Sequence, residues 1–307
     1  MNKERDSYSG SKKEIRLSKS TLKHIRLLKQ EKDTDGAFEF REKALERKKA
    51  QQRRGLEKLE RRLKEESDPY KIAEMKFTTP WLKEKLGDIT EHERKQDIKK
   101  IITGLEPDIF KWFMIEKNGK GRTRVREIIN RIAPSAKEPL RELTELEIKL
   151  MAKERFTPEE NIKTEFTLPW LKEKLGDITV NERKKNLKEI IIQLEPDIFK
   201  KFVMEKNGNG KTKAREIIDK IFPRDESLNE LEELKIKQMG EKYLSPEEAL
   251  EIKFTCIWLE VKSGEIVKDD ERFEKIINLY KSYPGIAEAF KKDKARKIVD
   301  KIMPSLR

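Results

Sequence analysis

An internal repeat of about 88 residues constrains this chain more than any other feature of its sequence. The segment FTTPWLKEKLGDITEHERKQDIKKII from Phe77 is matched by FTLPWLKEKLGDITVNERKKNLKEII from Phe166 and by FTCIWLEVKSGEIVKDDERFEKII from Phe254. A unit that recurs at this spacing is one supersecondary assembly with its own hydrophobic positions. Three residue types recur in register: Trp81, Trp170 and Trp258; Pro107, Pro196 and Pro284; Phe113, Phe202 and Phe290.

Helix signals follow one another in the same order in each copy. Pro69, Pro158 and Pro246 each come directly after a capping residue, which marks a helix start. In the second copy, the spacing of apolar residues predicts a series of helices. They cover Glu145–Arg155, a capped segment from Pro158, a short segment carrying PWLKEKL that stops near Gly176, Asn181–Leu194, Pro196–Lys206 and Thr212–Ile221.

The composition favours a mainly α fold. Charged residues make up 43% of the chain and hydrophobic residues only 35%, so the interior has to be built from narrow apolar stripes on helices. We expect a short N-terminal strand-helix-helix segment followed by three tandem all-helical repeat domains, each with its own small core like a bead. The boundaries are residues 1–55, 56–142, 143–230 and 231–307, and the third copy lacks seven residues of a loop.

The charge balance indicates a polyanionic partner. Lys and Arg number 72 against 59 Asp and Glu, which gives a formal net charge of +13. Residues 1–68 alone carry a surplus of seven positive charges. Such a surplus attracts nucleic acid or anionic lipid surfaces by long-range electrostatics, and a membrane is the weaker option of the two. With no apolar run of about 18 residues and no signal-peptide pattern, we expect a cytoplasmic protein that does not enter a membrane.

Residues 12–49 carry the pattern strand, helix, turn, helix. Ile15 and Leu17 alternate with polar residues, a capped helix begins near Ser18, and the DTDG from Asp33 separates it from a second helix. This order resembles the ribbon-helix-helix family of DNA-binding proteins. The resemblance implies a homodimer formed through this segment, whose paired strands enter the major groove of double-stranded DNA.

The resemblance also assigns roles to individual residues. It aims Lys12, Glu14 and Arg16 at base edges and places a phosphate at the N-terminus of the second helix, near Thr34. Arg16 is the side chain suited to guanine, whereas the acidic Glu14 departs from what such readout favours. The alternative interpretation is that residues 12–66 form one long basic helix or a partly disordered arm, because EFREKALERKKAQQRRGLEKLERRLKEE is continuously helix-favouring.

Glycine-rich loops in the first two copies are the second candidate site. EKNGKGRTRVREII from Glu116 and EKNGNGKTKAREII from Glu205 join a turn to a basic helix, an arrangement that suits a phosphate. The alternative is an ordinary Asn-Gly turn with solvated charges. The predicted contacts are Lys120, Arg122, Arg124, Arg126, Lys211, Lys213 and Arg215.

Nothing in the sequence points to catalysis. Cys256 and the two histidines are too few for a structural metal site, and His92 is replaced in the other copies. The carboxylates around Pro107 and Pro196 suit helix capping. Each Trp-Leu pair recurs with the core positions and is expected to be buried. We therefore expect no enzyme activity, cofactor or metal, because linked copies favour binding.

Three functions remain open at this point. The first is a dimeric protein that binds double-stranded DNA and acts in transcription control or replicon maintenance. The second is a helical scaffold that docks a protein partner, with the basic segment as a tether. The third is RNA binding, because arginine-rich segments also fold on structured RNA.

The readout hypothesis predicts the effect of Arg16→Ala in the full-length chain. Losing a bidentate contact to guanine should cost about 1–3 kcal/mol of discrimination between the preferred duplex and a scrambled one. Fluorescence anisotropy with both duplexes measures this difference. If affinity and sequence preference are both unchanged, the strand does not read bases.

Overall fold

A computed structural model describes residues 34–223, 226–266 and 268–303, and these residues are almost entirely helical. The mainly α prediction is confirmed. The chain divides into two compact units, residues 1–134 and 135–307, each described by itself below. The predicted strand and first helix of residues 12–33 lie outside the described residues. Within the described part there is no strand, only isolated bridges at Lys117–Thr123 and Lys206–Thr212.

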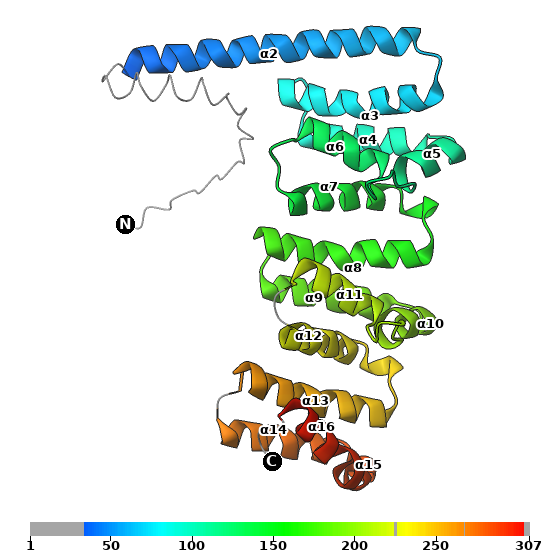
Figure 1. Cartoon of the computed structure of the whole chain (residues 1–307), viewed down its shortest axis with the longest axis vertical. Helices are drawn as coiled ribbons and strands as arrows, with labels where there is room; N and C mark the ends of the chain where they lie inside the picture. Colours follow the sequence, from blue (N-terminus) through cyan, green and yellow to red (C-terminus); the bar gives the residue numbers. More distant parts are fainter. Residues whose placement is uncertain (1–33, 224–225, 267, 304–307) are drawn as a thin grey trace, which may run out of the picture. The chain divides into compact units, whose positions relative to one another are not determined.

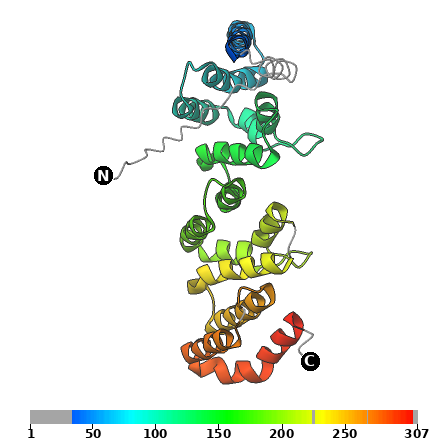
Figure 2. The same ribbon diagram turned by 90° about the vertical axis from the view of Figure 1, so that its left-hand side faces the viewer.

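The first unit is a set of helices around Phe77 and Phe113, which are fully buried and meet edge to face at 5.2 Å between ring centroids. α2 packs along α3, and α3 in turn contacts α4, α5 and α6 (Figures 1 and 2). Thr34–Glu65 form one continuous basic helix, α2, which is the described part of the long helix that the sequence allowed as an alternative. The helices are α2 (Thr34–Glu65), α3 (Pro69–Leu86), α4 (Glu91–Thr103), α5 (Pro107–Met114) and α6 (Arg124–Ile132).

The second unit contains two series of helices in the same order. A short 3-10 turn, η1 or η3, follows each lead helix, and π-helical turns η2 and η4 extend α10 and α15. The elements are α7 (Glu138–Met151), η1 (Lys153–Arg155), α8 (Pro158–Leu175), α9 (Val180–Gln193), α10 (Pro196–Phe199), η2 (Lys200–Met204), α11 (Lys213–Ile221), α12 (Glu226–Met239), η3 (Glu241–Tyr243), α13 (Pro246–Ser263), α14 (Asp269–Ser282), α15 (Pro284–Phe290), η4 (Lys291–Ala295) and α16 (Arg296–Ile302).

Helix starts and stops follow the sequence signals closely. Thr157 caps α8 in a reciprocal capping box with Glu160, and Pro158 occupies the first helical position. α8 ends at Gly176, whose φ of 80° is the left-handed conformation that glycine adopts without strain. Glu195 stands at the N-cap of α10 but makes no side-chain capping hydrogen bond, so its predicted capping role is limited to electrostatics.

One predicted boundary is wrong. The sequence was interpreted as two helices between Pro158 and Gly176, but α8 is continuous and carries Pro169 inside it. A proline in a helix interior removes one backbone donor. Phe166 and Trp170 lie on either side of Pro169 and are both buried in one core, and this burial holds the two halves together. α13 has Ile257 at the same position and is equally long.

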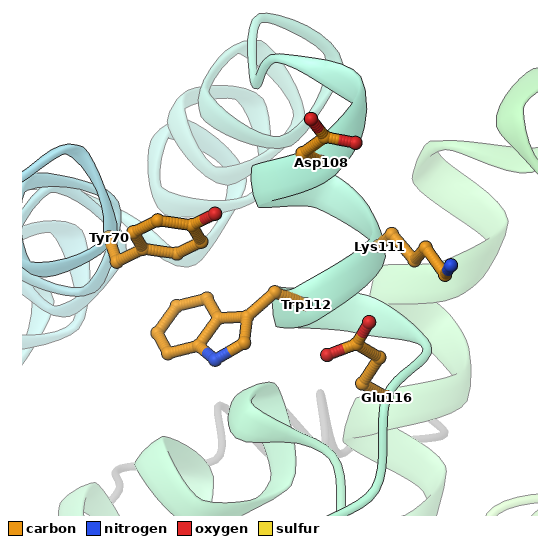
Figure 3. A pocket seen from close by; sticks show the side chains of 5 residues that line it. All are labelled: Tyr70, Asp108, Lys111, Trp112 and Glu116. Atoms are coloured by element: carbon orange, nitrogen blue, oxygen red, sulfur yellow. The ribbon is translucent and has the colours of Figure 1, made fainter.

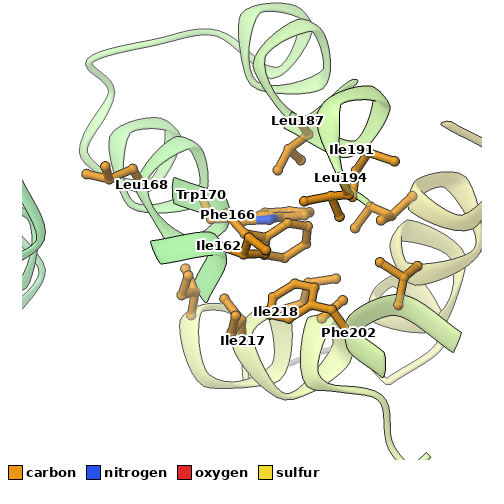
Figure 4. Close-up of a cluster of buried hydrophobic side chains, with 14 of the residues drawn as sticks. Ile162, Phe166, Leu168, Trp170, Leu187, Ile191, Leu194, Phe202, Ile217 and Ile218 are labelled. Atoms are coloured by element: carbon orange, nitrogen blue, oxygen red, sulfur yellow. The ribbon is translucent and has the colours of Figure 1, made fainter. Parts of the chain in front are cut away.

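The core of the second unit lies between its helices rather than inside separate beads. Figure 4 shows Phe166 and Trp170 between Leu187 and Ile191 on one side and Ile218 on the other. α12 contributes side chains to two hydrophobic clusters, because Ile236 packs into this core while Leu231 packs with Cys256 of α13. The expectation of independent beads is therefore wrong within this unit, where one helix shares its faces between the two sequence copies.

Trp170→Ala tests how much this core contributes to the free energy of unfolding. Trp170 is only 2% exposed, so removing its ring should lower the free energy of unfolding by about 3–5 kcal/mol. Urea unfolding followed by circular dichroism measures the change. Val180→Ala, at a side chain that is 45% exposed, should change it by less than about 0.5 kcal/mol. Equal effects of the two substitutions would contradict the buried role of Trp170.

Candidate functional site

The loop between α5 and α6 is a closed turn built around Asn118. Its side-chain Oδ1 accepts hydrogen bonds from the backbone N–H groups of Lys120 at 2.9 Å and Arg122 at 3.1 Å. The Gly121 N–H donates to the Asn118 carbonyl, and Gly121 has a φ of 70°. These backbone donors are already used inside the turn. They are not offered to a phosphate, so the N–H groups of Lys120, Gly121 and Arg122 do not form the phosphate site predicted for this loop.

The second copy repeats this turn around Asn207. Its Oδ1 accepts from the N–H groups of Asn209 at 2.9 Å and Lys211 at 3.2 Å, and Gly210 has a φ of 74°. In Figure 2 both turns project as narrow hairpins, the first in blue-green and the second in yellow. The Asn-Gly turn that the sequence allowed as an alternative therefore describes the backbone of both loops. Any ligand of these loops has to be held by side chains.

The start of α6 is already occupied by carboxylates. Thr123 caps the helix by accepting from the Arg126 N–H, and Glu127 accepts hydrogen bonds from Asn118 and Arg124. The hydrogen bond from Arg124 is the main reason that the pKa of Glu127 lies below its ordinary value. Arg124 also donates to Glu74 of α3 at 2.5 Å. These contacts fix Arg124 across the N-terminus of α6.

A pocket of about 260 Å³ brings several basic side chains together beside this loop. Lys120 and Arg122 are exposed and form no ion pair within the described part of the chain. Arg131 is paired with Glu74 at 3.3 Å but remains 62% exposed. The lining residues are Lys120, Arg122, Arg124, Glu127, Asn130 and Arg131, and we call this the basic pocket.

Two of the predicted phosphate contacts are buried. Arg126 is 5% exposed and Arg215 is 4% exposed. Arg215 donates to Asp219 at 2.7 Å and to the Glu226 carbonyl at 2.7 Å, which joins α11 to α12. Neither guanidinium faces solvent, so the assignment of these two residues to phosphate binding is corrected to a structural role.

The equivalent surface of the second copy is neutralised. Asn209 replaces Lys120, and Asp219 replaces Asn130. Lys211 Nζ lies 2.6 Å from Asp219 Oδ2, and Lys213 forms an ion pair with Glu159. The structure therefore brings Lys120, Arg122 and Arg124, but not Arg126, together in the basic pocket of the first copy. It does not do so in the second.

The remaining predicted residues have no side-chain description. Lys12 and Arg16 lie outside the described residues, and Thr34 is the first residue of α2. Three residues that line pockets of the first unit were not among the predicted site residues: Arg131 in the basic pocket, and Trp112 and Tyr70 in a second pocket described below. A signal for the last two was present, because Trp112 aligns with Lys201 and Tyr70 with Glu159, so neither belongs to the shared core pattern.

Comparison with known proteins gave no match to a protein family, to a curated protein or to a solved structure. The helices of the described residues include none that is both long and apolar enough to cross a bilayer. In the same part of the chain, no group of three or more His, Cys, Asp or Glu side chains is placed to hold a metal ion. The side chains of the basic pocket are thus the guide to function.

The ion pairs of Asp219 predict a pH-dependent stability. Burial would raise the pKa of this carboxyl, but hydrogen bonds from Lys211, Arg215 and Asn229 outweigh it and hold the pKa below 3.8. Its stabilisation is therefore complete above the unfolded-state pKa and is lost as the pH falls through the lower folded-state pKa. Asp219→Asn should lower the free energy of unfolding by about 1–3 kcal/mol at neutral pH.

Urea unfolding at a series of pH values between about 2 and 7 measures this difference. The difference in the free energy of unfolding between the original chain and Asp219→Asn should disappear at the acidic end of the series. Asp177→Asn, at an exposed carboxylate of the same unit, should cause little loss at any pH. A gap for Asp219→Asn that persists unchanged to the lowest pH would contradict the pairing.

Proposed function

We propose that this chain binds nucleic acid and that the basic pocket of the first unit contacts the phosphate backbone. The observation that carries the proposal is the grouping of Lys120, Arg122, Arg124 and Arg131 around one pocket with a single lining carboxylate. Lys120 and Arg122 have no ion pair to give up among the described residues, so a phosphate gains their full attraction. Each such contact releases counterions from the nucleic acid, which favours binding.

Double-stranded DNA remains the proposed target, and RNA the alternative. Side chains on a rigid turn position the backbone without reading its sequence, because phosphates are the same in every sequence. Base readout stays assigned to the N-terminal segment around Arg16, whose proposed dimer would join two chains. In this proposal the three tandem helical modules have unequal roles, and the first carries the backbone contact.

A protein-docking scaffold is the second candidate, and one observation favours it. Phe273 and Ile277 lie one turn apart on α14 and are 55% and 51% exposed. The first two copies have Lys95 and Lys184 at the Phe273 position. An apolar pair where the other copies are basic is typical of a contact surface. Phe273 and Ile277 are separate residues from the basic pocket, so the two candidates can be tested separately.

Lys120→Asn with Arg122→Asn tests the phosphate contact in the full-length chain. Both side chains are exposed, so the fold should be kept while two backbone contacts are lost. The slope of log K against log salt concentration should fall by about two, with similar losses for different sequences. Fluorescence anisotropy with a labelled duplex across a salt series measures it.

Lys185→Asn with Lys188→Asn is the matched control. It makes the same change in net charge at two exposed positions of α9 in the second unit. The control should leave the slope nearly unchanged, whereas a general charge effect would lower it equally in both variants. Equal slopes for the two variants would show that the basic pocket does not contact the phosphates. If the original chain shows no salt-dependent binding to duplex DNA or RNA, the protein-docking scaffold is the remaining candidate function.

A further inference from the structure

A second pocket, of about 380 Å³, lies on the first unit around an aromatic pair of an exposed Tyr70 and a partly buried Trp112. Tyr70 from the first turn of α3 meets Trp112 of α5 edge to face, with 5.0 Å between ring centroids and 79° between ring planes. Asp108, Lys111 and Glu116 complete the lining, and we call this the aromatic pocket (Figure 3). Tyr70 is 39% exposed, so solvent reaches the pair.

The fold does not require these two rings. Trp81, Trp170 and Trp258 recur in every copy, but Trp112 aligns with Lys201 in the second copy and with Ala289 in the third. Tyr70 likewise aligns with Glu159 and Glu247. The second copy is also helical at these positions with two charged residues, Glu159 in α8 and Lys201 in the π-helical turn η2. A half-exposed aromatic pair that only one copy carries is suited to contact a ligand rather than to support the core.

We propose that the aromatic pocket takes an unpaired nucleobase, stacked on Trp112, from a strand whose phosphates occupy the basic pocket. This inference rests on the proposed function and names its substrate more closely as nucleic acid with a single-stranded stretch. Every base has a flat π face, so an exposed tryptophan ring accepts any of them by stacking. A paired base inside a duplex does not present that face.

Arg124 of the basic pocket lies near Trp112 of the aromatic pocket. Its guanidinium lies 5.8 Å from the Trp112 ring centroid, and the same side chain lines the basic pocket. A single strand alternates bases with phosphates, so it needs stacking surfaces and cationic side chains next to one another. The first unit provides this alternation within one short stretch of surface, between the α5 helix and the α5–α6 loop.

The acidic side chains of the aromatic pocket give it a base preference. Asp108 and Glu116 are exposed and have no ion-pair partner among the described residues. Glu116 lies beside Trp112, whereas Lys111 points away from the rings (Figure 3). Carboxylate oxygens only accept hydrogen bonds, so they suit the exocyclic amino groups of cytosine and adenine. Thymine and uracil have no such group.

A cationic peptide side chain is the competing ligand, because aromatic rings and carboxylates also attract ammonium and guanidinium groups. The surroundings disfavour it. Arg124 already lies near the Trp112 ring, and Lys120, Arg122 and Arg131 follow in the basic pocket. Their positive field repels a second cation and attracts a strand with a negative backbone.

Trp112→Ala in the full-length chain tests the stacking. Labelled 12-nucleotide oligomers of dC, dA and dT and a duplex of the same length are titrated by fluorescence anisotropy. Affinity for oligo-dC and oligo-dA should fall about tenfold or more, while duplex affinity and the salt slope stay unchanged. Trp112→Phe keeps an aromatic ring for packing and should give an intermediate loss. Phe273→Ala removes an exposed ring from the second unit and should have no effect.

Intrinsic fluorescence gives a readout that belongs to Trp112. Oligo-dC should quench the emission of the original chain, and Trp112→Ala should abolish the quenching. The original chain should bind oligo-dC and oligo-dA more tightly than oligo-dT. Glu116→Gln should reduce this difference in affinity.

The outcomes separate this inference from the proposed function. If the original chain binds and the Lys120/Arg122 variant is impaired while Trp112→Ala binds every oligomer normally, the base pocket is wrong and the proposed function stands. If the original chain binds no nucleic acid, the proposed function itself fails. Quenching by N-acetyl-arginine amide without quenching by any oligomer would assign the aromatic pocket to a peptide cation instead.

Discussion

A stacked arginine and tryptophan tie together the two central helices of each sequence copy. Arg94 lies 3.9 Å from the ring centroid of Trp81, joining α4 to α3, and Arg183 lies 3.8 Å from that of Trp170, joining α9 to α8. Both guanidiniums are almost fully buried, and an unpaired buried charge would cost several kcal/mol. Glu84 and Glu173, one on each tryptophan helix, provide the partner carboxylates. Arg183 has a second partner in Glu232 of α12 at 2.8 Å, and Arg94 has one in Glu91 at 3.5 Å, so each stack is stabilised by more than one carboxylate.

The third copy shows what happens when the group of arginine, tryptophan and glutamate is incomplete. Arg272 is the corresponding arginine, one residue further from its tryptophan than in the other copies, and it lies 5.1 Å from the Trp258 ring centroid, but Val261 stands where the other copies have the glutamate. Arg272 pairs instead with Asp269 of its own helix at 2.9 Å and is more exposed than its counterparts. The same copy has lost the loop that precedes the last helix, and a π-helical turn, η4, fills that connection. Departures from the shared pattern thus accumulate at this copy.

Because the shared residues satisfy the core, the positions that differ between copies are available for binding. The basic pocket depends on Lys120 and Asn130, which become Asn209 and Asp219 in the second copy. Asp219 neutralises Lys211 and is itself held by Arg215, and Asn209 stands where the first copy has Lys120, so these differences together close the cationic surface of the second copy. Divergence at a few surface positions on a conserved arrangement of helices explains how near-duplicate sequences present different surfaces.

The sequence predicted the mainly α fold and most helix ends, because caps such as Thr157 and Pro158 act locally and need no tertiary information. The predictions were wrong where tertiary contacts determine the local structure. Burial of Phe166 and Trp170 overrides the break expected at Pro169, and the Asn118 side chain takes up amides that the glycine pattern left open. Arg126 and Arg215 look like their exposed neighbours in sequence, and only packing against the rest of the fold distinguishes them.

The same reasoning identifies the alignment between copies as the most informative sequence signal for the site. A residue that recurs in register, such as Trp170, is explained by the core, whereas one that changes, such as Trp112, is not. Changed residues of the first copy lie near one another in space, since Arg124 of the basic pocket lies 5.8 Å from the ring centroid of Trp112 in the aromatic pocket. In the chain, this copy directly follows the first 68 residues, which carry over half of the net charge of +13. The surplus positive charge and the residues that differ between copies therefore lie in the N-terminal half of the chain, where the proposed nucleic acid would gain the most from successive contacts.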